Sequence, residues 1–204
     1  AAAVRANDLG LDVLILEKSD KLGGVAAYSA GHVWVPNNHL MCSSAAGDSQ
    51  DAAALYMDHV GGAARVDLEL RGAFIEQAPP AIEYYHDAGI EFRAIEDYPD
   101  LFYPQAPGSS PGGRNLEAVV FGSDLGKWRR TLQPSPHFEL GLTRSEIIRL
   151  RAEGDAGQVD RLRRNRVEAD FLTLGQGLTG AFVKAAVCDR GVEVLIDSPA
   201  RRLL

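Results

Sequence analysis

The sequence predicts an α/β fold, and three stretches of the chain carry this prediction. Residues 12–16 form a short apolar run of the kind that a buried parallel strand shows. Residues 1–8 are rich in alanine and have the character of a helix end that can pack tightly on a sheet. Residues 192–196, which are apolar except for Glu193, have the character of a strand, which we expect to return to the same sheet. A largely helical and irregular insertion separates the two strands.

The residues after the first strand have the chemistry of a dinucleotide site. Glu17 ends the strand, where a carboxylate can accept hydrogen bonds from both ribose hydroxyls of an adenine dinucleotide, and Lys18 follows it. Gly23 and Gly24 then allow the backbone to pass close to a bulky cofactor and to turn N–H groups toward phosphate. The Gly-x-Gly-x-x-Gly turn that precedes such a helix is absent, so we expect a fragment of a longer protein that starts inside the helix.

Composition is that of an ordinary globular protein, because 46% of the 204 residues are hydrophobic and 24% are charged. The net charge of -7 argues against a nucleic-acid partner. Cys42 and Cys188 have neither metal-ligand spacing nor a disulfide framework, which predicts a cytoplasmic protein without a metal site. No apolar run reaches the roughly 18 residues of a membrane span.

The insertion is expected to begin with helices. Ser49 or Asp48 can cap the first of them. A second helical stretch covers residues 66–88, and the Pro79-Pro80 pair should kink it or divide it in two.

The rest of the insertion alternates between strand, loop and helix. Residues 90–95 alternate as a strand would, and residues 96–113, with four prolines, predict an ordered irregular loop. Thr143 and Glu146 form a capping box that begins a helix, and residues 155–172 predict a further surface helix. A helix of small residues at 175–186 should then pack closely on the sheet.

Four segments, in their order along the chain, resemble one known family. They are LEKSDKLGG (16–24), AYSAGHVWVPNNHL (27–40), YPDLFYPQAPGSSPGGRNLE (98–117) and LGQGLTGAFVKAA (174–186). The chain resembles the FAD-dependent oxidoreductases of the fumarate reductase and succinate dehydrogenase flavoprotein family, and most closely their 3-ketosteroid dehydrogenase branch. The resemblance implies FAD as cofactor and a partial Rossmann-like FAD-binding domain. In this domain, residues 1–39 would form the first part. Residues 40–172 would form an insertion of helices and loops, and residues 173–204 would return to the FAD-binding sheet.

The resemblance also implies which residues hold FAD, besides Glu17 and the two glycines. Tyr28, Ser29, Ala30 and Gly31 would run beneath the flavin, with Gly31 letting the backbone approach the ring. The backbone of Ala200 would pair with the adenine edge.

Some positions depart from the family or have two readings. Val25 and Ala26 stand where relatives usually carry hydroxyl residues that bind the cofactor. His32 stands where a small residue is more common; it either tunes the flavin or touches substrate, or it is a partly exposed loop histidine, which we favour. Arg114 either anchors the loop or faces a substrate carboxylate, and we favour the anchor.

The implied reaction is desaturation of an apolar, ketosteroid-like ketone by proton abstraction and hydride transfer to flavin. In this branch a loop tyrosine helps to activate the base, and both Tyr98 and Tyr103 fit that position. The base and most of the substrate pocket would lie outside the chain, so the fragment alone should be inactive. The alternatives are a fumarate reductase-like flavoprotein and a non-catalytic, truncated nucleotide-binding fragment. Glu17 is also compatible with an NAD-dependent dehydrogenase, but the segment AYSAGHVWVP does not suggest one. The sequence does not identify the electron acceptor.

Overall fold

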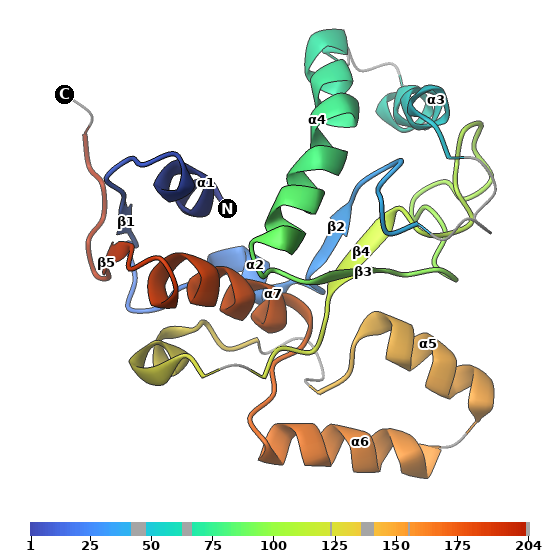
Figure 1. The fold of residues 1–204 in the computed structure, drawn as a ribbon. Coiled ribbons are helices and arrows are strands. Elements are labelled where there is room, and N and C mark those ends of the chain that lie inside the picture. The colour runs from blue at the N-terminus through green and yellow to red at the C-terminus, as the bar shows by residue number, and fades with distance from the viewer. Residues whose placement is uncertain (42–47, 63–66, 123, 136–140, 155, 203–204) are drawn as a thin grey trace.

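The computed structural model describes residues 1–41, 48–62, 67–122, 124–135, 141–154 and 156–202 (Figure 1). The helices α3 and α4 lie at one end of the molecule and α5 and α6 at the other, with the strands and α7 between them. The elements in chain order are α1 (Ala2–Asp8), β1 (Leu14–Leu16), α2 (Gly24–Tyr28), β2 (His32–Trp34), α3 (Gln50–Gly61), α4 (Leu68–Asp87), β3 (Phe92–Ala94), β4 (Asn115–Ala118), the 3-10 helix η1 (Gly126–Thr131), α5 (Arg144–Glu153), α6 (Ala156–Glu168), α7 (Leu174–Val183), the π turn η2 (Lys184–Cys188) and β5 (Glu193–Leu195).

The first and last strands of the chain pair with each other. β1 and β5 are parallel neighbours, with Ile15 opposite Val194. Val4 of α1 is fully buried in the main hydrophobic cluster, to which Ile15 also packs. The α/β class, the N-terminal helix and the strands expected at 12–16 and 192–196 are therefore confirmed.

A second sheet has three antiparallel strands in the order β2-β4-β3. The sequence predicted β3 within its 90–95 strand, but it predicted neither β2 nor β4. Polar Asn115 and Glu117 alternate with Leu116 and Ala118 in β4, but the strand is only four residues long and all four are buried, so its polar positions do not mark a solvent-exposed face. His32 opens β2, and the expectation that it is a loop histidine is wrong.

The helix α4 runs without interruption through Pro79 and Pro80 (Figure 1). The expectation that the proline pair could divide this helix is wrong. Each proline removes one backbone hydrogen bond, but Ile75 and Ile82 on either side of the pair are 5% and 6% exposed. Packing on both sides of the prolines therefore holds the helix together. Val66, where we expected the helix to begin, lies outside the described residues, and Asp67 caps the helix.

The other helix starts follow the sequence closely. The hydroxyl of Ser49 accepts a hydrogen bond from the N–H of Ala52, so Ser49 is the cap of α3. Thr143 and Glu146 form the predicted capping box at the start of α5. The expected surface helix is α6, and residues 96–113 form neither helix nor strand.

Small residues let α7 pack directly on α2. A side chain at Gly175 would approach the carbonyl oxygen of Ala26 to 2.1 Å. A side chain at Gly31 would approach the carbonyl carbon of Leu174 to 2.5 Å. The sequence predicted close packing of this helix on the sheet, whereas these close contacts of α7 are with α2 and the turn after it, and they position the segment between α2 and β2.

Candidate cofactor and active site

A cavity of about 210 Å³ lies between α1, α7 and the parallel strand pair, and it reaches Glu17 at the carboxyl end of β1. Parallel α/β sheets bind their ligands outside the carboxyl ends of the strands. The lining of the cavity includes Ile15, Glu17, Leu22, Gly23, Thr179 and Val194. Two residues that the sequence assigned to the cofactor, Glu17 and Gly23, therefore share one cavity.

The backbone of Glu17 is held by the chain around β5. Its N–H donates to the carbonyl oxygen of Leu195 at 2.9 Å, and its carbonyl oxygen accepts from the N–H of Ser198 at 2.8 Å. The carboxylate atom Oε1 accepts from both the N–H and the hydroxyl of Ser19. Within the described residues Oε2 makes no hydrogen bond, so the carboxylate keeps capacity to accept from ribose hydroxyls.

Gly23 and Gly24 both have left-handed backbone, with φ of 110° and 49°. A side chain at Gly23 would meet the Cβ of Ala27 at 3.0 Å, whereas the space beside Gly24 is open. The chain therefore exposes bare backbone at Gly24, beside the cavity that Gly23 lines. This arrangement fits the approach of a bulky cofactor.

The segment expected beneath the flavin is partly occupied by its own contacts. The hydroxyl of Ser29 donates to the carbonyl oxygen of Ala26 at 2.8 Å and accepts from the N–H of Gly31 at 3.0 Å. Residue 31 must be a glycine, because a side chain there would collide with the backbone of Leu174. Tyr28 and Ala30 are half-buried. The structure thus gives Ser29 and Gly31 a folding role beside the predicted cofactor role.

Two further predicted cofactor residues lie on the surface. Lys18 and Ala200 are exposed, Lys18 directly after Glu17 and Ala200 two residues after Ser198. Because Ser198 is bonded to Glu17, both residues lie near the end of the parallel strand pair.

The two candidate tyrosines lie in different places. The ring of Tyr98 meets the ring of His32 edge-on, with centroids 5.5 Å apart. The ring of Tyr103 meets His59 of α3 in the same manner, at 5.3 Å, and Tyr103 is 50% exposed. Because His32 directly follows Gly31, Tyr98 lies beside the predicted cofactor segment, whereas Tyr103 lies against α3.

His32 and Arg144 complete the surroundings of Tyr98. The guanidinium of Arg144 lies 5.6 Å from the centre of the Tyr98 ring. Burial lowers the pKa of His32, the charge of Arg144 lowers it further, and Glu117 opposes this. The Nε2 atom of His32 is buried and has no partner among the described residues. Sequence reasoning did not assign Arg144 to the site, because no local pattern links residue 144 to residue 98.

The buried carboxylate of Glu117 joins α5 to the antiparallel sheet. It accepts from the N–H of Arg144 at 2.6 Å and from Nη2 of Arg93 at 2.8 Å. In the register of the sheet, Glu117 lies between His32 and Arg93. The start of α5 is thus fixed next to His32, the residue whose ring contacts Tyr98.

Arg114 anchors the 96–113 loop, as the sequence analysis favoured. It is 1% exposed, its Nη1 donates to Oδ2 of Asp100 at 2.8 Å and its Nε donates to Oδ2 of Asp48 at 3.0 Å. Asp100 also accepts from Nε1 of Trp34 at 2.6 Å. Burial acts to raise the pKa of Asp48, but the hydrogen bonds from Arg114 outweigh it, and the pKa lies below its usual value.

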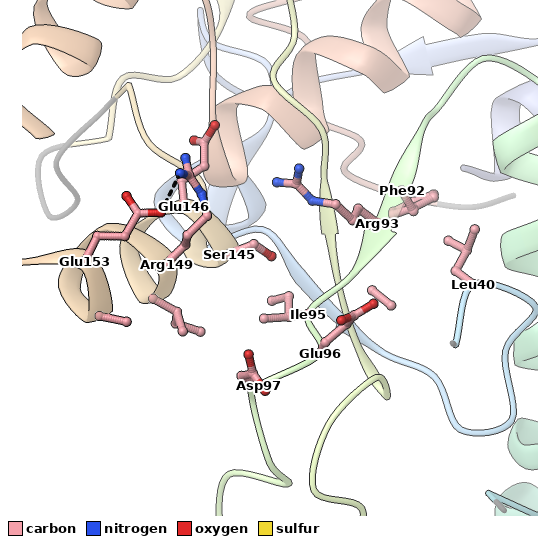
Figure 2. Close-up of a pocket in the computed structure, with 13 residues that line it drawn as sticks. Leu40, Phe92, Arg93, Ile95, Glu96, Asp97, Ser145, Glu146, Arg149 and Glu153 are labelled. Atoms are coloured by element: carbon pink, nitrogen blue, oxygen red, sulfur yellow. Dashed lines mark hydrogen bonds and ion pairs between the residues drawn. The ribbon is translucent and has the colours of Figure 1, made fainter. Parts of the chain in front are cut away.

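A larger cavity of about 750 Å³ lies between β3 and α5, as Figure 2 shows. Four of its charged side chains, those of Arg93, Glu146, Arg149 and Glu153, are engaged within the protein. Arg149 pairs with Glu153 at 3.0 Å, Arg93 pairs with Glu117, and Glu146 pairs with Arg166. It shares no residue with the predicted cofactor set, so we assign it no ligand.

The described part of the chain lacks two other kinds of feature. No group of three or more potential ligand side chains there could hold a metal ion. None of the helices there is long and apolar enough to cross a membrane. Cys188 is free, and Cys42 lies outside the described residues.

A parallel strand pair that ends in a carboxylate beside bare glycine backbone defines a nucleotide-binding α/β protein. The family described as "FAD binding domain" matches residues 1–204, and the chain belongs to it. FAD is accordingly its cofactor, and the residues around the cavity of Glu17 fit the ribose and the close backbone approach that FAD requires.

Known relatives confirm the resemblance to the 3-ketosteroid dehydrogenase branch. The chain is 30% identical to a 3-oxosteroid 1-dehydrogenase of Comamonas testosteroni, over 100% of this chain and 38% of the relative. It is 34% identical to a 4-oxocyclohexanecarboxylate 2-dehydrogenase of Sinomonas cyclohexanicum, over 57% of this chain and 20% of the relative.

A solved structure agrees with these relatives. It is a 3-ketosteroid delta1-dehydrogenase from Sterolibacterium denitrificans in complex with 1,4-androstadiene-3,17-dione, with a TM-score of 0.80 and 29% identity. The match covers 96% of this chain and 38% of that one. The chain therefore spans less than half the length of the relatives it matches.

Proposed function

We propose that this chain is the cofactor-binding part of an FAD-dependent dehydrogenase that introduces a carbon–carbon double bond beside the carbonyl of an apolar ring ketone. The names of the relatives support this, because 3-oxosteroids and 4-oxocyclohexanecarboxylate are both ring ketones. The observation that carries the proposal is the contact of Tyr98 with His32, directly after the predicted cofactor segment.

When bound, FAD supplies the acceptor for the hydride that leaves the substrate. In our proposal Glu17 accepts hydrogen bonds from the ribose, and Gly23 and Gly24 let the backbone lie close to the cofactor. Ser29 and Gly31 shape the turn that leads from α2 to β2. In the same proposal the backbone of Ala200, two residues beyond Ser198, would pair with the adenine edge of the cofactor.

We assign Tyr98, and not Tyr103, to the active site. A tyrosine hydroxyl there can exchange a proton with the group that takes the substrate proton. The lowered pKa of His32 keeps its imidazole uncharged at neutral pH, so no charge from His32 opposes the entry of an apolar ring. Arg144 then provides the positive charge nearest to the Tyr98 ring that the structure records.

The test is the visible spectrum of the full-length protein, recorded without oxygen. We expect a flavin band that bleaches on addition of androst-4-ene-3,17-dione, which has two hydrogens more than the steroid bound in the solved relative. Succinate is the control, because only a fumarate reductase-like flavoprotein would be bleached by it. Bleaching by succinate alone, or a protein without a flavin band, would overturn the proposal. A cytoplasmic location stays a prediction from the cysteine content.

A further inference from the structure

A second pocket, of about 510 Å³, lies between α3, α4, β2 and the 96–113 loop. Its walls include Trp34, Tyr56, Met57, Phe74, Leu101 and Phe102, and Asn115 also lines it. It shares no lining residue with the cavity of Glu17. We call it the aromatic pocket. Its size is in the range of pockets that enclose small organic ligands.

Three aromatic rings in this pocket lie nearly parallel. The ring of Trp34 stacks on that of Tyr56 with centroids 5.9 Å apart, and on that of Phe74 at 6.1 Å with an angle of 10°. Phe102 is 77% exposed and Leu101 is 53% exposed. Large apolar side chains gathered around a pocket, with their surfaces open, are typical of a binding site for an apolar group.

One polar side chain interrupts these apolar walls. Asn115 is 3% exposed, and its Nδ2 atom has no hydrogen-bond partner in the described part of the chain. Asn115 lies opposite Trp34 in the register of β2 and β4, so both side chains are on the face of the sheet that α3 and α4 cover. A buried amide donor without an acceptor is unfavourable, and an acceptor oxygen on a ligand would relieve it.

The charged groups near the pocket, one guanidinium and two carboxylates, are paired with one another. The guanidinium of Arg114 lies 5.5 Å from the centre of the Trp34 ring, but it is paired with Asp100 at 2.8 Å and with Asp48. A charged ligand would therefore find no free counterion among these residues. The surroundings favour an uncharged compound.

We propose that the aromatic pocket binds an uncharged, apolar ring compound that carries one carbonyl oxygen. The ring lies against Trp34, Phe74 and Phe102, and the carbonyl oxygen accepts a hydrogen bond from Nδ2 of Asn115. The site is separate from the cofactor cavity and does not depend on the proposed reaction.

Equilibrium dialysis of the full chain with a matched pair of probes tests this proposal. The probes are 1-tetralone and tetralin, which share the bicyclic skeleton and differ in the carbonyl oxygen. We expect 1-tetralone to bind about fivefold more tightly than tetralin, the size expected of one hydrogen bond. Asn115→Leu should bring the ratio of the two affinities to about 1, because leucine keeps the branching at Cγ and removes the donor.

Phe102→Ala provides a second variant that does not rely on a buried substitution. Because Phe102 is 77% exposed, its removal should leave the fold intact while it weakens binding of both probes about threefold or more. Val167→Ala on α6 removes a 55% exposed apolar side chain elsewhere and should change neither affinity. Absence of binding of both probes, or binding that Phe102→Ala leaves unchanged, would overturn the proposal. An unchanged ratio in Asn115→Leu would overturn the role of the amide.

Discussion

The rings of Tyr98 and His32 meet edge-on at 5.5 Å, and this contact joins the irregular loop to the strand that follows the cofactor segment. Tyr103, only five positions further along the chain, lies against α3. The two tyrosines that the sequence could not separate are therefore separated by the fold. The proximity of Tyr98 to residues 28–31 makes it the stronger candidate for the active site.

Replacing the two tyrosines one at a time tests this assignment. In the full-length protein, Tyr98→Phe should slow substrate-dependent bleaching of the flavin about 100-fold or more, the usual contribution of a group that takes part in proton transfer. Tyr103→Phe should change the rate less than about threefold, because its ring contacts the surface of α3. The opposite ranking would assign the role to Tyr103.

Glu17→Gln should weaken FAD binding about tenfold or more, since a charged acceptor contributes more to a hydrogen bond than an amide does. The quenching of FAD fluorescence on binding gives the dissociation constant. Asp20→Asn makes the same chemical change three residues away, at a side chain that is 67% exposed, and should leave the constant unchanged. Equal effects of the two substitutions would contradict a specific role of Glu17.

Gly31→Ala should lower the free energy of unfolding by about 2 to 4 kcal/mol, because the new Cβ would lie 2.5 Å from the backbone of Leu174 and the residue has a φ of 69°. Gly191→Ala is the matched control, with a φ of 67° and open space around the Cβ, and should cost about 1 kcal/mol. Urea unfolding of both variants gives the difference, which measures the steric clash alone.

Arg114→Met should destabilise the protein by about 3 to 5 kcal/mol, because it leaves two buried carboxylates without their counterion. Arg149→Met removes a guanidinium whose side chain is 54% exposed and should cost less than about 1 kcal/mol. Thermal unfolding distinguishes these two outcomes. Similar costs would mean that the Asp48–Arg114–Asp100 network does not anchor the loop.

Acid should weaken the same network. Because the folded-state pKa of Asp48 is lowered, its ion pair stabilises the protein above the usual carboxyl pKa, and this contribution is lost as the pH falls through the lowered value. The free energy of unfolding of Asp48→Asn should fall less than that of the unmodified protein between about pH 4 and pH 2. Parallel pH profiles of the two proteins would show that Asp48 contributes nothing to the acid sensitivity.

The sequence predicted the parts of the fold that have a local signal. β1 lies in an apolar run, β5 is apolar apart from Glu193, and the capping box of α5 lies within four residues, so all three could be predicted from neighbouring positions. β4 could not, because the burial of Glu117 depends on Arg93 and on the N–H groups of residues 144 and 145, which are distant in sequence.

The same difference between local sequence signals and contacts of distant residues holds for the candidate site. Glu17 and Gly23, which the sequence singled out from their spacing after an apolar run, line one cavity. The contacts of Tyr98 with His32 and Arg144 depend on tertiary packing alone. For this reason, the sequence could name candidate cofactor residues but left the choice between the tyrosines open.

The carboxylate of Glu117 has a consequence for protein engineering. It serves the first N–H groups of α5 although it belongs to a strand, so the helix cannot be exchanged as an independent module. If a graft replaced α5 and provided no N–H groups for Glu117, this buried carboxylate would lose these hydrogen bonds. It lies opposite His32, the residue whose ring contacts Tyr98. Designers who want to vary the surface of this helix should therefore keep residues 143–145 and confine their changes to its exposed later turns.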